Sequence, residues 1–583
     1  MILVPQHKID AYTARGWWGT QTLGALFEQH RRERPDEEAV VDAPNRADFA
    51  HGTPRRLTWA QLGEQADRFA LLLLAQGIRA SDVVLVQLPN CVEQFIVYVA
   101  CARLGIIVTP VPIQYREHEL SHIIEVAKPR AAVSFIRIGK PGGGHAAAGM
   151  FVALSQAHAT LRTVMAWGES VEAGIVDVGA ALAAAPTPAQ RQELEQAEGD
   201  AAITANDVFT ICWTSGTEAT PKGVPRSHNE WLVVAPSIIE AGEIKPHARL
   251  LNPFPLVNMA GFSTAFAAWL MLGATVVQHQ PFSLPVFLQQ LRDERIDYTI
   301  AAPAILNTML QNEQLLAGID FVRLAHIGSG SAPLSEWMVR GFAERHNVQI
   351  VNYFGSNEGA ALAGSHVDIP DPELRAQFFP RAGVPEHSWK ISTTRKIRTR
   401  LVDPDTNEDI DEIGHVGEIR FHGPTIFSGY YNAPDLTQRA FDEHGFYKTG
   451  DLFEIAGDRK QFYRYVGRSK DLVIRGGVNI SSEEIENLLL ACPGVREAAV
   501  VGVPDDVLGE KVCACVVSAD GGQVLTLAAI TAFLREHKRV AVYKLPEYLL
   551  ALTELPRNPV GKILKRELRE RAAVLATSEK ATA

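Results

Sequence analysis

Cysteines and long apolar runs are both scarce in this chain of 583 residues. The six cysteines form no CxxC pair and mostly lie in apolar runs, so they indicate reduced core residues and argue against a disulfide framework. No apolar run approaches the roughly 18 residues that a membrane-spanning helix needs. The N-terminal segment also lacks the unbroken apolar core of a signal peptide. The sequence therefore predicts a cytoplasmic protein with no transmembrane segment.

An excess of basic charge is missing as well. Asp and Glu number 67 and Lys and Arg number 56, which gives a formal net charge of -11. A nucleic-acid partner needs a basic face, so we expect no nucleic acid to bind. A local phosphate site stays compatible with this charge, because a few lysines and helix N-termini are enough to hold an anion.

The chain length and the alternation of patterns indicate more than one domain. A chain of this length exceeds what one hydrophobic core supports. Thr58 and Gln61 fit a capping box that opens a helix, and a strand over 83–88, a helix over 93–104 and a strand over 106–111 follow. This βαβ pattern predicts a parallel sheet covered by helices.

A smaller α+β pattern begins near Asp471, where Ser481 and Glu484 give another capping signal. The polar stretch 183–206 is typical of a surface connection, and the tail after about residue 572 is typical of disorder. The fold class predicted is α/β, with a large N-terminal domain of helix-covered β-sheets and a smaller α+β C-terminal domain.

One motif suggests a metal. His118 and His122 spell HExxH, which on a helix can place two imidazoles around zinc. The places where a third ligand is expected do not supply one, so a solvated polar helix face is the simpler interpretation. A zinc peptidase built on these two histidines is kept as a remote alternative.

Residues 214–223 read TSGTEATPKG and follow an apolar strand over 208–213. Hydroxyls, backbone amides and a lysine on one loop suit a polyphosphate, although alone they would indicate an ordinary surface loop. Companion motifs follow in order: GSGSAP at 328–333, YFGSNE at 353–358, YKTGD at 447–451, GRSKD at 467–471 and NPVGK at 558–562.

This ordered set resembles the adenylate-forming superfamily of acyl-CoA synthetases, luciferases and nonribosomal adenylation domains, over nearly the whole chain. The resemblance implies that ATP and a carboxylic acid give an acyl-adenylate and pyrophosphate, and that the thiol of CoA then takes the acyl group. It implies ATP, Mg²⁺ and CoA as partners of the small-molecule acid. The implied ATP- or AMP-binding residues are Thr214, Ser215, Gly216, Thr217, Lys222, Ser331, Ala332, Pro333, Phe354, Gly355, Asn357, Asp451, Arg468 and Lys562.

The resemblance gives some of these residues definite tasks. Thr214, Glu358 and Lys562 are the implied catalytic residues, with Glu358 as the Mg²⁺ ligand, because a carboxylate oxygen suits a hard cation that bridges phosphates. Phe354 should stack on adenine, and Asp451 should accept hydrogen bonds from both ribose hydroxyls. Lys562 should bridge the substrate carboxylate and the α-phosphate and so stabilise the transition state.

The resemblance also divides the chain, with an adenylate-forming domain over 1–466, a mobile domain over 471–583 and a hinge near 467–471. Lys470 occupies the hinge position. CoA would pass Gly476 and Gly477, where the lack of a side chain lets a narrow group approach the backbone. The acyl pocket would be lined by Asn258, Met259, Phe262 and Phe266, although the two phenylalanines are equally consistent with the core.

Some residues depart from the superfamily pattern. Glu218 would repel phosphates unless it turns outward, and Asn357 stands where Thr is usual, although its amide can still donate to a phosphate oxygen. Neither Val257 nor Asn258 is acidic, which argues against an amino-acid substrate. The segment after Asn258, which would line the acyl pocket by the resemblance, is mostly apolar and carries no charge, so an apolar acid, fatty or ring-bearing, is expected. The alternatives are an acyl-AMP ligase that serves a carrier protein and a module that only binds nucleotide.

Overall fold

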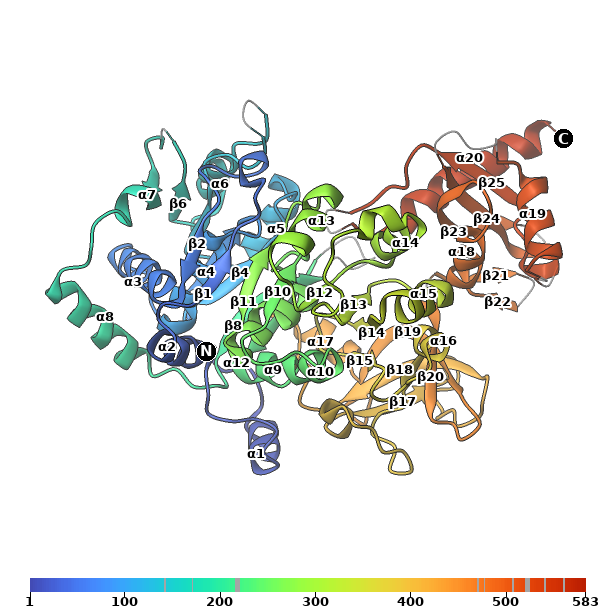
Figure 1. Cartoon of the computed structure of the whole chain (residues 1–583), viewed down its shortest axis with the longest axis horizontal. Coiled ribbons are helices and arrows are strands. Elements are labelled where there is room, and N and C mark those ends of the chain that lie inside the picture. Colours follow the sequence, from blue (N-terminus) through green and yellow to red (C-terminus); the bar gives the residue numbers. More distant parts are fainter. Residues whose placement is uncertain are drawn as a thin grey trace. The chain divides into compact units, whose positions relative to one another are not determined.

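A computed structural model describes most of the chain: residues 1–140, 143–169, 171–214, 221–468, 471–475, 478–505, 508–519, 525–538, 540, 542–558 and 561–582. The chain divides into two compact units, the first made of 1–398 and 421–447 and the second of 399–420 and 448–583. Figure 1 labels the elements of both units. The expected hinge near 467–471 falls inside the second unit, and a domain boundary there stays a prediction.

Two sheets organise the first unit. One is ordered β15 (Ala361–Gly364), β14 (Gln349–Gly355), β13 (His326–Gly330), β12 (Tyr298–Ile300), β10 (Arg249–Asn252), β11 (Thr275–Gln278), β1 (Glu38–Val41) and β2 (Arg56–Thr58). The other is ordered β7 (Ile175–Asp177), β6 (Thr163–Trp167), β5 (Ala131–Phe135), β3 (Val83–Gln87), β4 (Ile107–Pro110), β8 (Val208–Thr214) and β9 (Lys222–Ser227). The described part of the unit also contains β16 (Phe378–Pro380).

The helices of the first unit include α1 (Gln6–Ala14), α2 (Leu23–Glu33), α3 (Trp59–Ala75), α4 (Val92–Leu104), α5 (Glu117–Ala127), α6 (Ala147–Ala157), α7 (Val178–Ala181), α8 (Pro188–Ala201), α9 (His228–Leu232), α10 (Ala235–Ala241), α11 (Met259–Gly261), the π-helix η2 (Phe262–Ala267), α12 (Ala268–Leu272), α13 (Leu284–Asp293), α14 (Pro303–Gln311), α15 (Glu336–His346), α16 (Pro372–Gln377) and α17 (Pro434–Ala440).

Successive side chains of a strand pack into different hydrophobic cores, because they point to opposite faces of the sheet. In β3, Val84 joins a core with α3 and α4, whereas Leu85 joins a core with α5 and α6. In β11, Val276 faces the α3 and α4 core, whereas Val277 packs with α13, α14 and α15. Helices therefore cover both faces of each sheet, and the strand ends that carry the motifs are held by buried neighbours.

The second unit contains strands ordered β20 (Phe462–Arg468), β19 (Tyr447–Ala456), β18 (Val416–His422) and β17 (Arg398–Val402), and the pair β19 and β20 is antiparallel. It also contains the sheet β22 (Val478–Ile480), β21 (Val473–Arg475), β24 (Gly509–Ser518) and β23 (Val495–Asp505), with β25 (Tyr548–Leu552) paired to β24. In β23, Val500 packs with α18 (Ser482–Leu490) and α19 (Leu527–Glu536), and Val501 packs with α20 (Lys565–Thr582).

The predicted α/β class, with a larger N-terminal and a smaller C-terminal part, is confirmed. Thr58 and Gln61 form the capping box that opens α3. Two local expectations are wrong. The stretch 183–206 contains α8, which Thr187 and Gln190 cap and which buries only Leu194 among its side chains. The tail is helical to Thr582, because α20 inserts apolar side chains such as Leu568 into the core.

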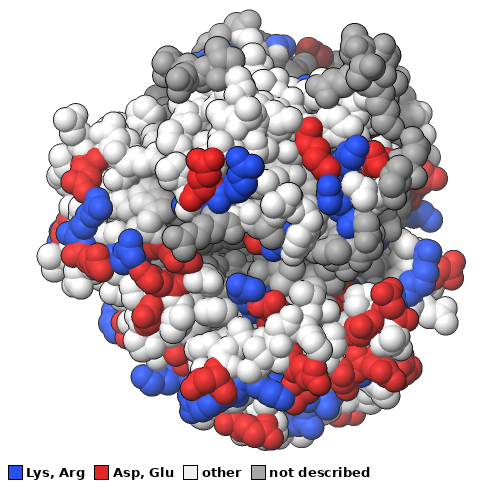
Figure 2. Space-filling model, turned by 90° about the vertical axis from the view of Figure 1, so that its right-hand side faces the viewer, with Lys and Arg blue, Asp and Glu red and all other residues white. Residues whose placement is uncertain are grey.

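All six cysteines are buried and free, as the apolar runs around them predict. Within the described residues, no helix is both long enough and apolar enough to cross a membrane. On the face drawn in Figure 2, blue and red side chains are interspersed rather than gathered into one basic area.

Candidate active site

The candidate phosphate loop joins two antiparallel strands. Thr214 ends β8 and lies opposite Lys222, which begins β9, and the backbone N–H of Lys222 donates to Thr214 Oγ1 at 3.4 Å. Ser215, Gly216 and Thr217 lie outside the described residues. The two described loop residues of the prediction are therefore brought together at the end of the hairpin where the loop joins its two strands.

Asn357 connects this hairpin to the start of the predicted acyl pocket. Its Nδ2 donates to the carbonyl oxygen of Trp213 at 3.2 Å, and its Oδ1 accepts from the backbone N–H of Met259 at 2.8 Å. One amide thus spans β8 and α11. The prediction from the sequence is that this amide can donate to a phosphate oxygen, and the structure adds the bridging role.

Glu358, the predicted Mg²⁺ ligand, is only 7% exposed. Its Oε1 accepts a 2.9 Å hydrogen bond from the hydroxyl of Tyr430, and Lys222 Nζ lies 5.4 Å from the centre of the same tyrosine ring. None of the described residues donates a hydrogen bond to Oε2. A phenol thus orients the carboxylate, while its second oxygen keeps its acceptor capacity for a cation.

The turn after Glu358 is locked by a buried arginine. Gly359 has φ of +96°, and a β-carbon there would lie 1.8 Å from the carbonyl oxygen of Thr425 and 2.5 Å from Arg226 Nη1. Arg226 is fully buried and donates to the carbonyls of Thr425, at 2.7 Å, and Glu230, at 3.0 Å. Burial lowers the pKa of this guanidinium, and the charges of Glu230 and Glu358 counteract that effect.

The predicted adenine-lining residues lie on two neighbouring parallel strands. Phe354, near the end of β14, lies beside Phe421 with centroids 6.3 Å apart and planes at 17°. β13 ends at Gly330, where a β-carbon would lie 2.4 Å from the carbonyl oxygen of Tyr353. Ser331 follows with φ of +70°. Ser331, Ala332 and Gly355 are exposed, and Pro333 is partly buried, so these residues lie at the accessible ends of the strands.

The predicted acyl segment divides into two parts. Asn258 caps α11 by accepting from the N–H of Gly261, and Met259 lies beside Asn357. Phe262 and Phe266 are 0% and 1% exposed and pack against other aromatic rings, including Tyr98, whose ring stacks on Phe262 at 5.3 Å. These contacts assign the two phenylalanines to the core, and their place in the acyl pocket stays a prediction.

In the second unit, Asp451 and Arg468 lie opposite each other on β19 and β20, with Arg468 Nε 3.0 Å from Asp451 Oδ1. Although burial acts to lower the pKa of Arg468, the charge of Asp451 raises it. Glu418 accepts from the N–H of Gly450, whose φ of +68° forms the turn before the aspartate. The sequence anticipated this pair, but not the contact between its members.

Lys562 is exposed, and a closed turn presents it: its N–H donates to Asn558 Oδ1, and the N–H of Asn558 donates to the carbonyl of Lys562, both at 2.8 Å. The predicted hinge residue Lys470 and the predicted CoA residues Gly476 and Gly477 lie outside the described residues.

A buried carboxyl group lies close to the predicted hinge. Tyr465 donates to Glu483 Oε1 at 3.3 Å, and a β-carbon on Gly467 would lie 3.4 Å from Glu483 Oε2. Burial raises the pKa of Glu483 to about 7, with Lys565 opposing this shift and Glu486 adding to it. Sequence reasoning could not single out Glu483, because the first turn of α18 contains two adjacent glutamates, Glu483 and Glu484, and nothing in the sequence shows which of them is buried.

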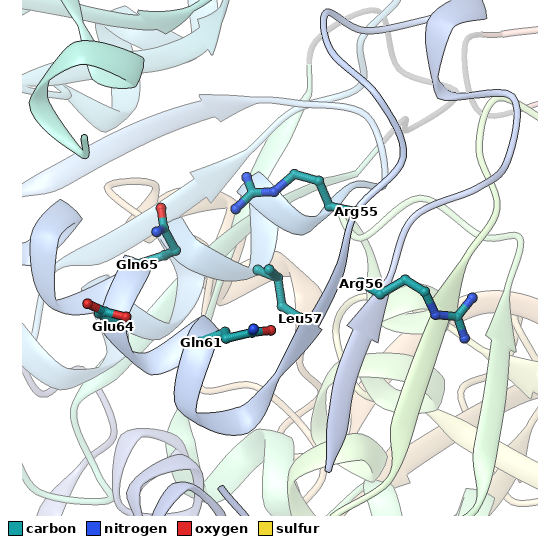
Figure 3. A pocket seen from close by; sticks show the side chains of 6 residues that line it. All are labelled: Arg55, Arg56, Leu57, Gln61, Glu64 and Gln65. Atoms are coloured by element: carbon teal, nitrogen blue, oxygen red, sulfur yellow. The ribbon is translucent and has the colours of Figure 1, made fainter. Parts of the chain in front are cut away.

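Two other features do not belong to this site. His122 Nε2 lies 3.1 Å from the carbonyl oxygen of Pro221, while His118 is exposed, and neither histidine belongs to a metal-ligand group among the described residues. A hollow of about 310 Å³ lies beside β2 and the start of α3. Figure 3 shows the side chains of Arg55 and Arg56 diverging there, and both pair with carboxylates, which leaves no reason to assign a ligand.

Tyr430, Arg226 and Gly359 are the residues that sequence reasoning missed. Tyr430 lies in the run Ser428-Gly429-Tyr430-Tyr431, and the aromatic pair after a glycine is a weak signal. Arg226 follows the phosphate motif by three residues and reads as an ordinary charged residue. Only the folded chain brings Tyr430 and Arg226 near Glu358, whereas Gly359 follows it directly in the sequence.

Comparison with known proteins agrees with this arrangement. A family model described as AMP-binding enzyme matches residues 27–431, and the model of its C-terminal domain matches 484–562. A 2-hydroxy-7-methoxy-5-methyl-1-naphthoate–CoA ligase from Streptomyces carzinostaticus is 32% identical over 97% of this chain and 96% of its own length. The medium-chain fatty-acid–CoA ligase of Escherichia coli is 29% identical, covering 97% and 93%.

Among solved structures, ATP-bound MatB from Rhodopseudomonas palustris superposes with a TM-score of 0.75 at 26% identity, over 95% of this chain and 99% of the other. The family match spans well over half of the sequence. The two matched ranges contain the motifs at 214–223, 328–333, 353–358 and 558–562, while the motifs at 447–451 and 467–471 lie between them. The chain belongs to the AMP-binding enzyme family and is an adenylate-forming acid–thiol ligase.

Proposed function

We propose that the chain is an AMP-forming ligase that joins an apolar carboxylic acid to CoA. The observation that carries this proposal is the segment from Leu256 to Leu272, which contains no charged residue. Its hydroxyls are satisfied within the helix, because Ser263 donates to the carbonyl of Met259 and Thr264 to that of Ala260. The segment is therefore apolar and uncharged from its start, which lies beside Asn357.

Asn357 supports placing the acid there. It precedes Glu358 and holds the N–H of Met259, so the start of the apolar segment lies one hydrogen bond from the predicted metal ligand. An acid bound against Met259 would have its carboxylate near the triphosphate. The names of the two relatives, one for a naphthoate and one for a medium-chain fatty acid, support a ring or a chain equally.

In the first half-reaction the acid's carboxylate oxygen attacks the α-phosphorus of ATP, the bond to the bridging oxygen breaks, and pyrophosphate leaves. Thr214 and Lys222 would hold the outgoing phosphates together with Ser215, Gly216 and Thr217. Glu358 fits a Mg²⁺ ligand, since Tyr430 orients it and its Oε2 accepts no hydrogen bond from a described residue. Bound there, the cation would supply neutralisation of phosphate charge.

The second unit would supply the remaining contacts. Asp451 would accept from the ribose hydroxyls, with Arg468 fixing its carboxylate. Lys562 would stabilise the negative charge that develops at the α-phosphate, as an exposed ammonium on a rigid turn can do. In the first unit, Phe354, with Ser331, Ala332 and Pro333, would bind the adenine.

In the second half-reaction the CoA sulfur attacks the acyl carbonyl and AMP leaves. We propose that Gly476 and Gly477 line the path of CoA and that Lys470 is the hinge. The alternative acceptor is the thiol of a carrier protein.

A screen of acids tests this function. Pyrophosphate release is measured with acids of increasing chain length, aromatic acids and acetate, each with CoA and with a phosphopantetheinylated carrier protein. Each buried CH₂ contributes roughly 0.8 kcal/mol, so kcat/KM should rise with apolar area until the pocket is full. A preference for acetate would contradict the apolar pocket, and thioester formed only on the carrier would contradict CoA.

A further inference from the structure

We propose that Glu243, His326 and His366 form a binding site for a divalent transition-metal ion of the zinc class, separate from the nucleotide site. The three residues come from separate parts of the first unit: Glu243 lies just past the end of α10, His326 begins β13, and His366 follows β15. Their ligand atoms all lie within 4.8 Å of one another.

The geometry suits a four-coordinate ion. Glu243 Oε2 lies 3.3 Å from His326 Nε2 and 3.4 Å from His366 Nε2. Zinc bonds of about 2.0–2.1 Å to nitrogen and oxygen, at tetrahedral angles, place neighbouring ligand atoms about 3.3–3.4 Å apart. The carboxylate oxygen therefore already stands at the spacing of a zinc coordination shell from each of the two histidine nitrogens, with a fourth position left for water.

Hydrogen bonding does not explain this spacing. His326 Nε2 is buried and makes no hydrogen bond to any described residue, although the carboxylate oxygen is close. N–H···O bonds typically span 2.7–3.2 Å, so both contacts are long for such bonds. His326 Nε2 is thus a buried polar atom with no hydrogen-bond partner among the described residues. A bound cation would accept its lone pair.

The donor set narrows the choice of ion. Two imidazoles and one carboxylate favour ions that bond strongly to nitrogen, such as Zn²⁺, Cu²⁺ or Co²⁺, over Mg²⁺ and Ca²⁺, which prefer oxygen ligands.

Glu243 also holds an uncommon backbone conformation. Its φ is +44°, in the left-handed region that residues other than glycine seldom adopt, and its side chain is about half exposed. Strain of this kind persists where surrounding structure requires the residue, often at ligand sites. The carboxylate lies beside the two histidines and is open to solvent and to an entering ion.

Such an ion would join α10, β13 and β15 without touching the nucleotide residues. β13 runs from His326 to Gly330, and at about 3.3 Å per residue Ser331 lies roughly 16 Å away along the strand. The expected consequence is stabilisation of the first unit against unfolding rather than participation in catalysis.

Cobalt titration tests the site directly. The full chain, freed of any histidine tag and treated with chelator, should bind one Co²⁺ with the visible absorption bands of four-coordinate cobalt, and Zn²⁺ should displace it. Zn²⁺ should also raise the unfolding temperature. The variants His326→Asn and Glu243→Gln should bind Co²⁺ at least about tenfold more weakly. The control variant His7→Asn, which changes an exposed histidine near the N-terminus, should bind Co²⁺ as the wild type does.

Glu243→Gly keeps the test decisive should a histidine variant misfold. Glycine accepts the left-handed φ, so this variant should fold without metal at least as well as wild type and should lose the Zn²⁺-dependent rise in unfolding temperature. Absence of saturable binding, or unchanged binding in these variants, would overturn the proposal. Binding that disappears only in His118→Asn would place the metal at the HExxH pair and overturn it as well.

Discussion

The hydroxyl of Tyr430 lies 2.9 Å from Glu358 Oε1 and fixes the carboxylate that the proposed mechanism assigns to Mg²⁺. The two residues are 72 positions apart in sequence. Tyr430 also carries Lys222 over its ring, so one side chain touches both the predicted metal ligand and the predicted phosphate lysine.

Tyr430→Phe removes this hydrogen bond while keeping the ring against Lys222. A hydrogen bond to a charged group contributes about 1.5–3 kcal/mol, so kcat/KM for pyrophosphate release at limiting Mg²⁺ should fall about 10- to 100-fold. Raising Mg²⁺ should recover part of the rate. Tyr431→Phe, next along the chain, is the control. Wild-type dependence on Mg²⁺ in Tyr430→Phe would refute the orienting role.

Gly359→Ala should damage the site by collision as well as strain. Its φ of +96° is unfavourable for alanine, and the new methyl group would meet Thr425 and Arg226. We expect a loss of unfolding free energy of about 3 kcal/mol or more, together with loss of activity. Gly77→Ala is matched, because Gly77 has φ of +73° and no neighbour within 4 Å. It should lose only about 1 kcal/mol, measured by urea unfolding. Equal losses would show that no collision occurs.

Glu483 should make stability depend on pH. Its folded pKa of about 7 exceeds the ordinary value of 4.5, so the folded state binds this proton more tightly than the unfolded state. The contribution is therefore complete below pH 4.5 and is lost as pH rises through 7. Glutamine imitates the protonated form, so Glu483→Gln should stabilise the protein at pH 8 by on the order of 1–3 kcal/mol and have little effect at pH 4.5.

Urea unfolding of both proteins at the two pH values checks this. Glu536→Gln, at an exposed acid on α19, is the control and should show no such difference. A Glu483→Gln effect that is the same at both pH values would mean that the carboxyl titrates normally in the folded protein.

The sequence predicted those parts of the site that are continuous along the chain. Thr214, Glu358 and Asp451 each lie in a short motif. Neighbouring glycine and hydroxyl residues in these motifs indicate the turns. The capping box at Thr58 was also predictable, because Thr58 and Gln61, three residues apart, form it through reciprocal bonds between the side chain of each and the backbone N–H of the other.

Contacts between distant segments were not predictable in this way. Arg226 reaches Thr425 across 199 positions, and Glu243 meets His326 and His366 only through three folded elements. The hydrophobic periodicity of a segment predicts its own secondary structure and carries no information on which distant segment it will contact. The helix α8 was missed for another reason: its polar composition resembles a loop, although Thr187 and Gln190 carry a capping box.

Separate assays of the two half-reactions in Lys562→Ala test the central claim most directly. The account assigns this ammonium to the transition state of adenylation alone. Pyrophosphate release from ATP and acid should fall by on the order of 10²–10³, while acyl-CoA formation from supplied acyl-adenylate should stay near the wild-type rate. A parallel fall of both half-reactions would contradict the account.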